Sequence, residues 1–216
     1  MFTGIIQAVG KIGQLEAFHN DARIYIHTAN LGLKTVELGD SIAVNGVCLT
    51  VIELATDGFY ADISNESLQK TTLGTLRVGS AVNLEKALTL QTPLGGHLVS
   101  GHVDGVGTIL KLATDGRSTR LHLRAPDVLL KYIAAKGSIC IDGISLTVNT
   151  IQQNEFTVNL VPHTLKNTTL DQAITGQQVN LEVDVIARYL ERLLLAQTES
   201  APTKLTESFL QQHGFG

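Results

Sequence analysis

The sequence has only two cysteines, no apolar run long enough to cross a membrane and no cluster of basic residues. Cys48 and Cys140 are isolated thiols far apart in the chain, so neither a disulfide framework nor a zinc knuckle is expected, and both are predicted to be reduced. The opening stretch MFTGIIQAVGKIG lacks the charged start and long apolar core of a secretory signal. These absences predict a cytoplasmic protein with no membrane partner.

The charge pattern also limits the class of ligand. Lysines and arginines are scattered, and the formal net charge is −4 at pH 7, which argues against a nucleic-acid surface and favours a small, locally recognised ligand. A chain of 216 residues with 44% hydrophobic residues can form one large domain or two small ones.

The most informative positive feature is an internal repeat. The segment MFTGIIQAVGKI from Met1 matches LVSGHVDGVGTI from Leu98, and SIAVNGVCLTV from Ser41 matches SICIDGISLTV from Ser138. Both matches, and further ones downstream, have the same offset of 97 residues with no gap. The chain is therefore predicted to be a tandem duplication.

Each copy has the pattern of a small antiparallel β-barrel. Short runs rich in β-branched residues are separated by Gly, Asn and Asp. In the first copy these runs are residues 23–28, 40–46, 49–54, 59–64 and 80–85. Short helical turns are expected near 33–38 and 129–136, and Pro93 with two glycines suits a linker over 90–96. We predict barrels over 1–97 and 98–185, followed by a helical segment and tail over 186–216.

Beyond the second copy the apolar period changes. In VDVIARYLERLLLAQ the apolar residues recur at three- and four-residue steps, which predicts a helix with one apolar stripe, formed by Val185, Ile186, Tyr189, Leu190, Leu193 and Leu194. That stripe either packs on its own barrel or joins subunits. A second short helix is expected after Pro202, ending at Gly214.

Several motifs at consistent spacings resemble the α chain of the riboflavin synthase family, with its lumazine-binding double barrel. They are MFTGII at the start, NGVCLTV at 45–51, GGHLVSGH at 95–102, KGSICIDGISLTV at 136–148 and VNLEVDV at 179–185. The resemblance extends over essentially residues 1 to 195, and several motifs at consistent spacings are more specific than any single short pattern.

The resemblance implies a fold, a reaction and an assembly. The fold would be all-β, with two tandem Greek-key six-stranded antiparallel barrels plus a C-terminal α-helix that joins three subunits. Two molecules of 6,7-dimethyl-8-ribityllumazine would yield riboflavin and 5-amino-6-ribitylaminouracil in the last step of riboflavin biosynthesis, with no metal or cofactor. Some relatives dock onto the lumazine synthase shell, and whether this chain does so is left open.

The two copies differ at several positions where one copy has a reactive or ionisable side chain that the other lacks. Cys48 corresponds to Ser145, Ile5 to His102, Glu66 to His163 and Ala87 to Asp184. Identical pockets would hold two identical rings face to face, and near-attack positioning can supply about 7–11 kcal/mol of a barrier. These differences predict that one copy binds the lumazine that donates the four-carbon unit and the other binds the lumazine that accepts it. Most groups that can exchange protons lie in the second copy.

The stretch GGHLVSGHVDG at 95–105 allows three interpretations. A metal site is disfavoured because His97, His102 and Asp104 on a glycine-rich turn offer no regular geometry. A linker suits Gly95 and Gly96, and His97 fits a solvated loop histidine as well as a functional one.

We expect His102 to lie in the first strand of the second copy, beside a glycine that lets the backbone approach a flat ligand, and to exchange protons near neutrality. Ser145 has no base next to it in sequence, so it is interpreted as a hydrogen-bonding or water-orienting group rather than a member of a nucleophilic triad. Cys48 alone would more often be a small buried hydrophobe than a nucleophile. Asp184 before the helix would ordinarily be a cap.

By resemblance, the catalytic set comprises His102, Ser145, Cys48, Asp184, Phe2, His97 and a Lys136 contributed by a neighbouring subunit. The binding positions implied for the first copy are Gly4, Ile5, Ile6, Cys48, Leu49, Thr50, Asp62, Ile63, Ser64, Asn65, Glu66 and Ser67. Those implied for the second copy, together with Lys136, are Gly101, His102, Val103, Ser145, Leu146, Thr147, Asn159, Leu160, Val161, Pro162, His163 and Thr164. Strand-edge amides can read a uracil-like edge, and Asn159 and Thr164 suit a polyhydroxyl tail.

Two other classes remain open. Fluorescent lumazine-binding proteins share the double barrel but carry the ligand without converting it, and they depart from the synthase pattern in the second copy. This chain keeps GGHLVSGH and DGISLTV there, which favours the enzyme. A generic ligand-binding barrel protein would account for the fold but not for the asymmetric residues.

Overall fold

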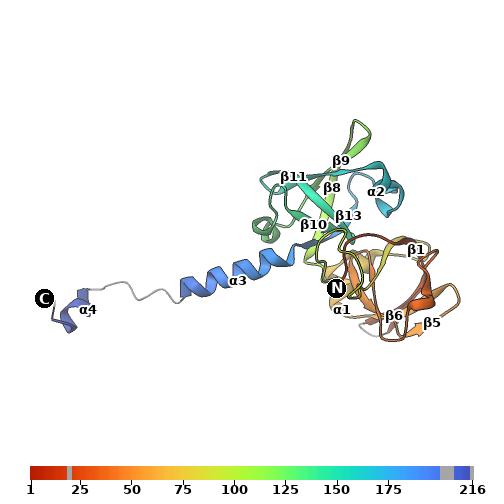
Figure 1. Cartoon of the computed structure of the whole chain (residues 1–216), viewed down its shortest axis with the longest axis horizontal. Helices are drawn as coiled ribbons and strands as arrows, with labels where there is room; N and C mark the ends of the chain where they lie inside the picture. Colours follow the sequence, from red (N-terminus) through yellow and green to blue (C-terminus); the bar gives the residue numbers. More distant parts are fainter. Residues whose placement is uncertain (19–20, 200–206, 215–216) are drawn as a thin grey trace. The chain divides into compact units, whose positions relative to one another are not determined.

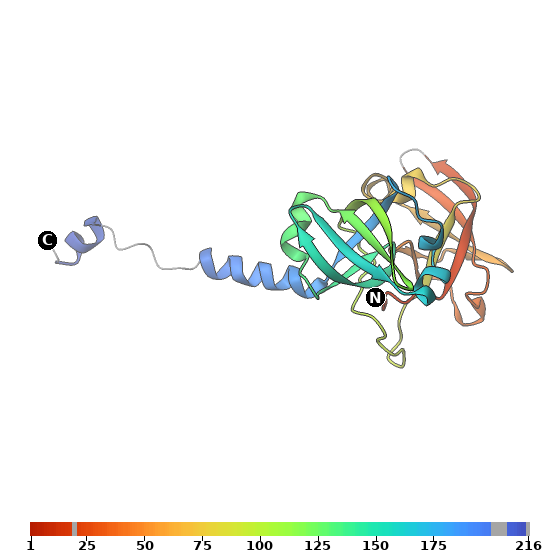
Figure 2. The ribbon, with the colours of Figure 1, turned by 90° about the horizontal axis from the view of Figure 1, so that it is seen from above.

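A computed structural model describes residues 1–18, 21–199 and 207–214 (Figures 1 and 2). The chain divides into two compact units, Met1–Val185 and Ile186–Gly216, and each is described by itself. The first unit contains two β-domains, coloured from red to yellow and from green to blue in Figure 1.

The first β-domain consists of β1 (Ala8–Phe18), β2 (Asp21–His27), β3 (Ser41–Val44), β4 (Val47–Thr50), β5 (Glu53–Leu54), β6 (Gly58–Ile63) and β7 (Ala81–Lys86). The second consists of β8 (Gly105–Asp115), β9 (Ser118–Arg124), β10 (Ser138–Ile141), β11 (Ile144–Gln152), β12 (Glu155–Leu160) and β13 (Gln178–Val183). Strand β8 starts and ends 97 residues after β1, and the same offset relates β2 to β9, β3 to β10, β6 to β12 and β7 to β13. The predicted duplication therefore holds strand by strand.

The second β-domain is a closed barrel with the order β10-β11-β12-β9-β8-β13 and antiparallel pairs throughout. The first is a half-barrel of seven strands in the order β4-β3-β7-β1-β2-β6-β5. Its two edge strands, β4 and β5, correspond to the single strand β11. The break at Val51 and Ile52 falls where β11 has a bulge between Val148 and Thr150. Tandem β-domains followed by a helix are thus confirmed, and among the described strands the closed ladder belongs to the second domain.

Short helices complete each copy. The first domain has η1 (Leu33–Thr35), α1 (Asn65–Lys70) and η2 (Thr72–Thr75), and the second has η3 (Asp127–Tyr132), α2 (Pro162–Lys166) and η4 (Thr169–Gln172). The expected helical turns coincide with η1 and η3. Residues 90–96 form turns and bends, as the linker prediction requires.

Each β-domain encloses its own apolar core, and a third buried cluster of Phe2, Ala43, Val99 and Cys140 lies where the domains meet. Strands β7 and β13 show little of the in-and-out alternation of an ordinary surface strand, because nearly all their residues are buried. Their outward residues, Asn83 and Glu85 on β7 and Asn180 and Glu182 on β13, are polar and buried. Both faces of these two strands are therefore covered, one by the core and one by the other domain.

The second unit contains most of α3 (Val185–Glu199) and α4 (Glu207–Gln212). Helix α3 matches the predicted amphipathic stretch, and Ile186, Tyr189, Leu190, Leu193 and Leu194 are all more than half exposed. Helix α4 lies within the second predicted helix, whose beginning falls outside the described residues. None of the helices described is long and apolar enough to span a membrane.

Candidate functional site

The segments that precede the first strand of each copy cross from one domain to the other. We call Phe2–Gln7 the first arm and Val99–Asp104 the second arm. The Phe2 amide donates to the Val99 carbonyl at 2.7 Å, and the Val99 amide donates back to Phe2 at 3.1 Å. Ile6 of the first arm packs against the core of the second domain, whereas Val103 packs against the core of the first. The two domains therefore exchange equivalent segments.

The exchange aligns each arm with a candidate residue of the opposite copy. The Ser145 amide donates to the Gly4 carbonyl at 2.8 Å, and the Cys48 amide donates to the Gly101 carbonyl at 2.9 Å. A Cβ on Gly101 would lie 2.6 Å from Cys48 Cβ and 2.8 Å from a Phe2 ring carbon. Protein atoms therefore fill the space beside the Gly101 Cα, and this glycine permits the close contact of its arm with Cys48.

One buried carboxylate fixes each arm. Glu85 accepts from the Thr3 amide and hydroxyl at 2.7 and 2.6 Å, and Glu182 accepts from the Ser100 amide and hydroxyl at 2.6 and 2.7 Å. Burial raises the pKa of both carboxyls, although these hydrogen bonds oppose the shift. Glu85 and Glu182 make equivalent hydrogen bonds, so these contacts fix the positions of the arms but do not distinguish the two copies.

The opening histidine of GGHLVSGHVDG has a partner that its sequence position did not suggest. His97 Nδ1 lies 2.7 Å from Ser145 Oγ, and the His97 amide donates to the Thr3 carbonyl at 3.2 Å. Ser145 has no base next to it in sequence, but in the structure the imidazole of a residue 48 positions earlier lies beside its hydroxyl. Gly96 is also more than a linker, because a Cβ there would lie 2.7 Å from Ser145 Cβ.

The environment of His97 keeps its imidazole neutral. Only 8% of the residue is exposed, and among the described residues its Nε2 atom is buried with no hydrogen-bond partner. Burial lowers the pKa of His97, and the nearby negative charge of Asp184 partly opposes this effect. A neutral imidazole with Nδ1 facing a hydroxyl can accept its proton. His97, Ser145 and Asp184 thus come from three distant segments, with a contact between the first two and an electrostatic influence of Asp184 on His97.

His102 lies in a different position from the one predicted. It precedes β8 rather than lying within a strand, and its side chain is exposed. The His102 amide donates to the Ser100 hydroxyl at 3.2 Å, and that hydroxyl donates to Glu182. The arm turns sharply at Gly101, with a φ of +84°, which ends the extended conformation before this residue.

Phe2 and Cys48 lie at the domain contact. Phe2 is fully buried in the cluster between the domains, and Cys48 is half-buried beside it. Cys48 pairs with Ala43 on the neighbouring strand, just as Ser145 pairs with Cys140. The thiol and the hydroxyl therefore occupy equivalent positions, and the His97 imidazole lies within hydrogen-bond distance of the Ser145 hydroxyl.

The other predicted binding residues lie on β4, β6 and α1 in the first domain and on β11, β12 and α2 in the second. Leu49, Ile63, Leu146 and Leu160 point into the cores, whereas Thr50, Ser64, Glu66, Thr147, Val161, Pro162 and His163 are exposed. Ile5 is also exposed, Ser64 caps α1 by accepting from the Ser67 amide at 3.2 Å, and Asn65 and Thr164 lie in the first turns of α1 and α2. Each set therefore combines buried strand residues with exposed residues on the same strands and near the helices that follow.

Two predicted polar residues already have protein partners. Asp62 pairs with Arg23 at 2.9 Å on the outer face of the sheet, where both side chains are largely exposed. The equivalent residues in the second domain, Asn159 and Arg120, both hydrogen-bond to Asp115. A ligand would have to compete with these contacts at Asn159.

Lys136 is exposed in the turn before β10 and adopts a φ of +68°. Asp184 directly precedes α3, as expected for a cap position. Asp104 is held on β13, where its carboxylate accepts from the Val183 amide at 2.8 Å.

Comparison with known proteins identifies the family. The lumazine binding domain family matches residues 3–87 and 100–184. Riboflavin synthase of Photobacterium phosphoreum is 45% identical over 216 residues, covering 100% of this chain and 99% of the relative, and riboflavin synthase of Photobacterium leiognathi is 46% identical with the same coverage. The crystal structure of LumP complexed with riboflavin superimposes with a TM-score of 0.79 at 29% identity, covering 85% of this chain and 99% of LumP. The chain belongs to the riboflavin synthases of the lumazine-binding domain family.

Proposed function

We propose that this chain converts two molecules of 6,7-dimethyl-8-ribityllumazine into riboflavin and 5-amino-6-(D-ribitylamino)uracil. One lumazine gives up a four-carbon unit and the other accepts it, so the atoms balance without an external oxidant and no metal or cofactor is called for. The observation that carries the proposal is that one chain contains the same β-domain twice, with different reactive groups at equivalent positions. A reaction between two identical substrates needs such a pair of similar but unequal sites.

We propose that the domains comprise residues 1–97 and 98–185, each with one lumazine site. The first would use Gly4–Ile6, Cys48–Thr50 and 62–67, and the second would use Gly101–Val103, Ser145–Thr147 and 159–164. The exposed members of each set, such as Thr50 and Thr147, would contact a flat ring that is covered by a second ring from another site. Holding both rings in a near-attack arrangement would contribute much of the rate.

The second site would carry the proton transfers. His97 would accept the proton of Ser145 or of a water molecule held by it, since the two atoms are 2.7 Å apart and the imidazole is neutral. Asp184 would stabilise the imidazolium formed in that step. His102, exposed at the end of its arm, would exchange protons with the ligand itself.

The first site would present Cys48 where the second presents Ser145. Cys48 packs in a mostly buried apolar cluster with Phe2, Ala43, Val99, Cys140 and Ala87. We therefore assign Cys48 to ring contact and Phe2 to the support of that wall. Lys136 would act on a site of a neighbouring subunit, since it is exposed in its own chain.

We propose that the active form is a homotrimer joined by α3. Five of its apolar side chains are more than half exposed, and such a stripe is stabilised by burial against other helices. A trimer would bring the open surface of one first domain against that of a neighbouring second domain. Cytoplasmic location belongs to the same proposal.

The deciding experiment supplies purified protein with the lumazine alone and follows the absorbance of riboflavin. We expect riboflavin and 5-amino-6-(D-ribitylamino)uracil to form in equal amounts. LumP, whose structure contains riboflavin, suggests the competing function of a non-catalytic carrier. Tight binding without any new absorbance would favour the carrier and refute the enzyme.

A further inference from the structure

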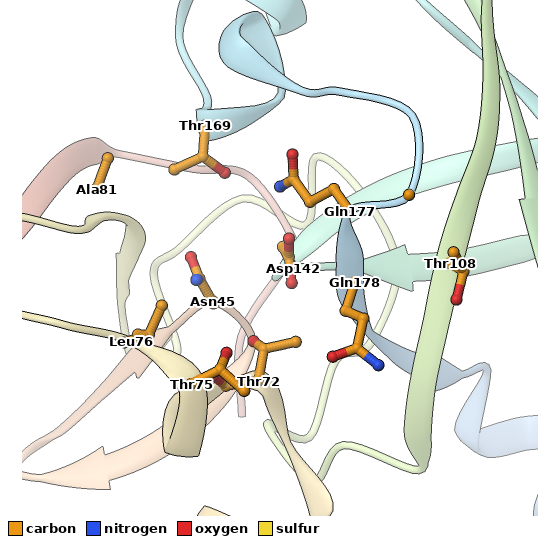
Figure 3. A pocket seen from close by; sticks show the side chains of 11 residues that line it. Asn45, Thr72, Thr75, Leu76, Ala81, Thr108, Asp142, Thr169, Gln177 and Gln178 are labelled. Carbon is orange, nitrogen blue, oxygen red and sulfur yellow. The ribbon is translucent and has the colours of Figure 1, made fainter.

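A cavity of about 520 Å³ lies between the two β-domains (Figure 3). It is bordered by η2 and β7 of the first domain and by η4, β8 and β13 of the second. None of its lining residues belongs to the proposed catalytic or lumazine-binding sets. An inference about this cavity is therefore independent of the proposed reaction.

The repeat gives the cavity paired walls. Asn45 and Asp142 are equivalent turn residues at its centre, and Thr72 and Thr169 are equivalent residues on opposite sides of it (Figure 3). The two turns are in close contact: a Cβ on Gly46 would lie 2.8 Å from the Gly143 amide nitrogen. The floor of the cavity is therefore fixed by packing that a bulkier residue would disrupt.

Two buried hydroxyls in these walls have no protein partner. Thr72 Oγ1 and Thr169 Oγ1 are both buried and make no hydrogen bond to any residue described. Thr72 is only 6% exposed. Their backbones are held, since the Thr72 amide donates to Asn180 at 2.7 Å and the Thr169 amide donates to Asn83 at 2.8 Å. Leaving a buried hydroxyl unsatisfied costs about 1–3 kcal/mol, so each would gain from a ligand that hydrogen-bonds there.

The remaining lining restricts the class of ligand. It contains no lysine, arginine, histidine or aromatic residue, and its only carboxyl group is that of Asp142, whose pKa is raised by burial to about 7. An anion would meet no cation there, and a flat ring would find no face to stack on. Within the described residues, no cluster of three His, Cys, Asp or Glu could hold a metal ion.

Neutral hydroxyls and amides form most of the surface. Thr75, Thr108, Gln177 and Gln178 add to the two orphan hydroxyls, and apolar side chains come only from Leu76 and Ala81. Hydroxyls and amides can both donate and accept, which is the pattern that recognises successive alcohol groups. The volume lies within the usual range for small-molecule sites.

We propose that this cavity binds one small, uncharged polyhydroxyl molecule, through Thr72, Thr169 and the amides around them. Such a chain could come from a free sugar alcohol or from the polyol tail of a larger ligand. In either case the two threonine hydroxyls accept and donate hydrogen bonds that the protein alone leaves unmade.

The test uses the full-length protein with ribitol as the probe and reads the backbone amides by NMR. We expect saturable shifts at residues around Thr72, Thr169 and Gln177. The double change Thr72→Val and Thr169→Val should weaken ribitol binding at least ~10-fold, because it removes both orphan hydroxyls at nearly constant shape. It should leave thermal stability unchanged or raised, since no protein hydrogen bond is lost.

Two further variants make the result decisive. Ala81→Gln places a longer side chain in the cavity and should also block ribitol, and the equivalent position in the second domain already carries Gln178. Thr114→Val, on the exposed face of β8, removes a hydroxyl elsewhere and should leave binding unchanged. No saturable shift, or shifts that the double variant retains, would show a water-filled cavity only and overturn the proposal.

A comparison of riboflavin with lumiflavin, which lacks the ribityl chain, distinguishes a free sugar alcohol from the polyol tail of a larger ligand. Shifts at the cavity with riboflavin alone identify the tail of a larger ligand, and shifts with ribitol alone identify a free sugar alcohol. Riboflavin formation is measured on the same samples and should be unchanged in the double variant. Riboflavin formation therefore reports on the proposed reaction, and the ribitol shifts report on this cavity, so failure of one proposal is distinguishable from failure of the other.

Discussion

The pairing of His97 with Ser145 makes the sharpest prediction about mechanism. His97→Asn keeps a nitrogen near the position of Nδ1, so a hydrogen bond to Ser145 can remain, but an amide cannot accept a proton. Ser145→Ala removes the other partner. The two single variants and the double variant form a cycle around one contact of 2.7 Å.

The expected magnitude follows from the role proposed for the pair. General base assistance contributes about 10²–10⁴ in rate, so each single change should lower kcat/KM by at least ~10²-fold, about 2.7 kcal/mol. If both residues act in one proton transfer, the double variant should be no slower than the singles, rather than slower by ~10⁴-fold. The coupling energy would then be about 2.7 kcal/mol.

The pH profile supplies an independent readout. Burial lowers the pKa of His97, so the imidazole is neutral at neutral pH and kcat/KM should fall only as the pH drops through that lowered value. His97→Asn should abolish this acidic limb. Stability should follow the same direction: the unfolded chain binds the proton more readily, so the contribution is complete above the unfolded pKa and is lost on acidification through the folded pKa.

The assay is riboflavin formation, with urea unfolding as a check that each variant is folded. His122→Asn, on β9 of the same domain, removes a histidine that makes no assigned contact and should leave the rate unchanged. Additive losses in the double variant, or an acidic limb that survives His97→Asn, would refute the paired proton transfer.

Three further outcomes are expected. His102→Gln should slow turnover by ~10²-fold or more with little change in unfolding, because the side chain is exposed; equal rates across pH 6 to 8 would remove it from the mechanism. A chain that ends after Val185 should sediment as a folded monomer with greatly reduced activity, and a trimer would show that α3 is not what joins the subunits. Gly101→Ala should lower the free energy of unfolding in urea by about 2–5 kcal/mol, from left-handed strain plus overlap with Cys48, whereas Gly116→Ala, with open space around it, should lose only about 1–2 kcal/mol.

Much of the fold could be read from the sequence because its determinants are local and repeated. The short runs rich in β-branched residues, separated by Gly, Asn and Asp, and the constant offset of 97 residues predicted the strands and the duplication. Five strands of the first domain recur in the second with both boundaries at that offset. The apolar stripe after Val185 predicted α3 for the same reason. One prediction failed in detail, since the first domain is a half-barrel: its counterpart of β11 breaks where a bulge only bends the second copy.

The tertiary structure decided which segments meet. His97 reaches Ser145 across 48 residues, and each arm packs against the opposite domain, because the outer faces of β7 and β13 are buried at the domain contact. No local pattern encodes such contacts. The sequence also does not show whether a glycine such as Gly101 is needed for close packing against another segment or for access of a ligand. The sequence determined what each copy is made of; packing between the copies determined that Gly101 touches Cys48, that His97 has a hydroxyl partner, and that Thr72 and Thr169 do not.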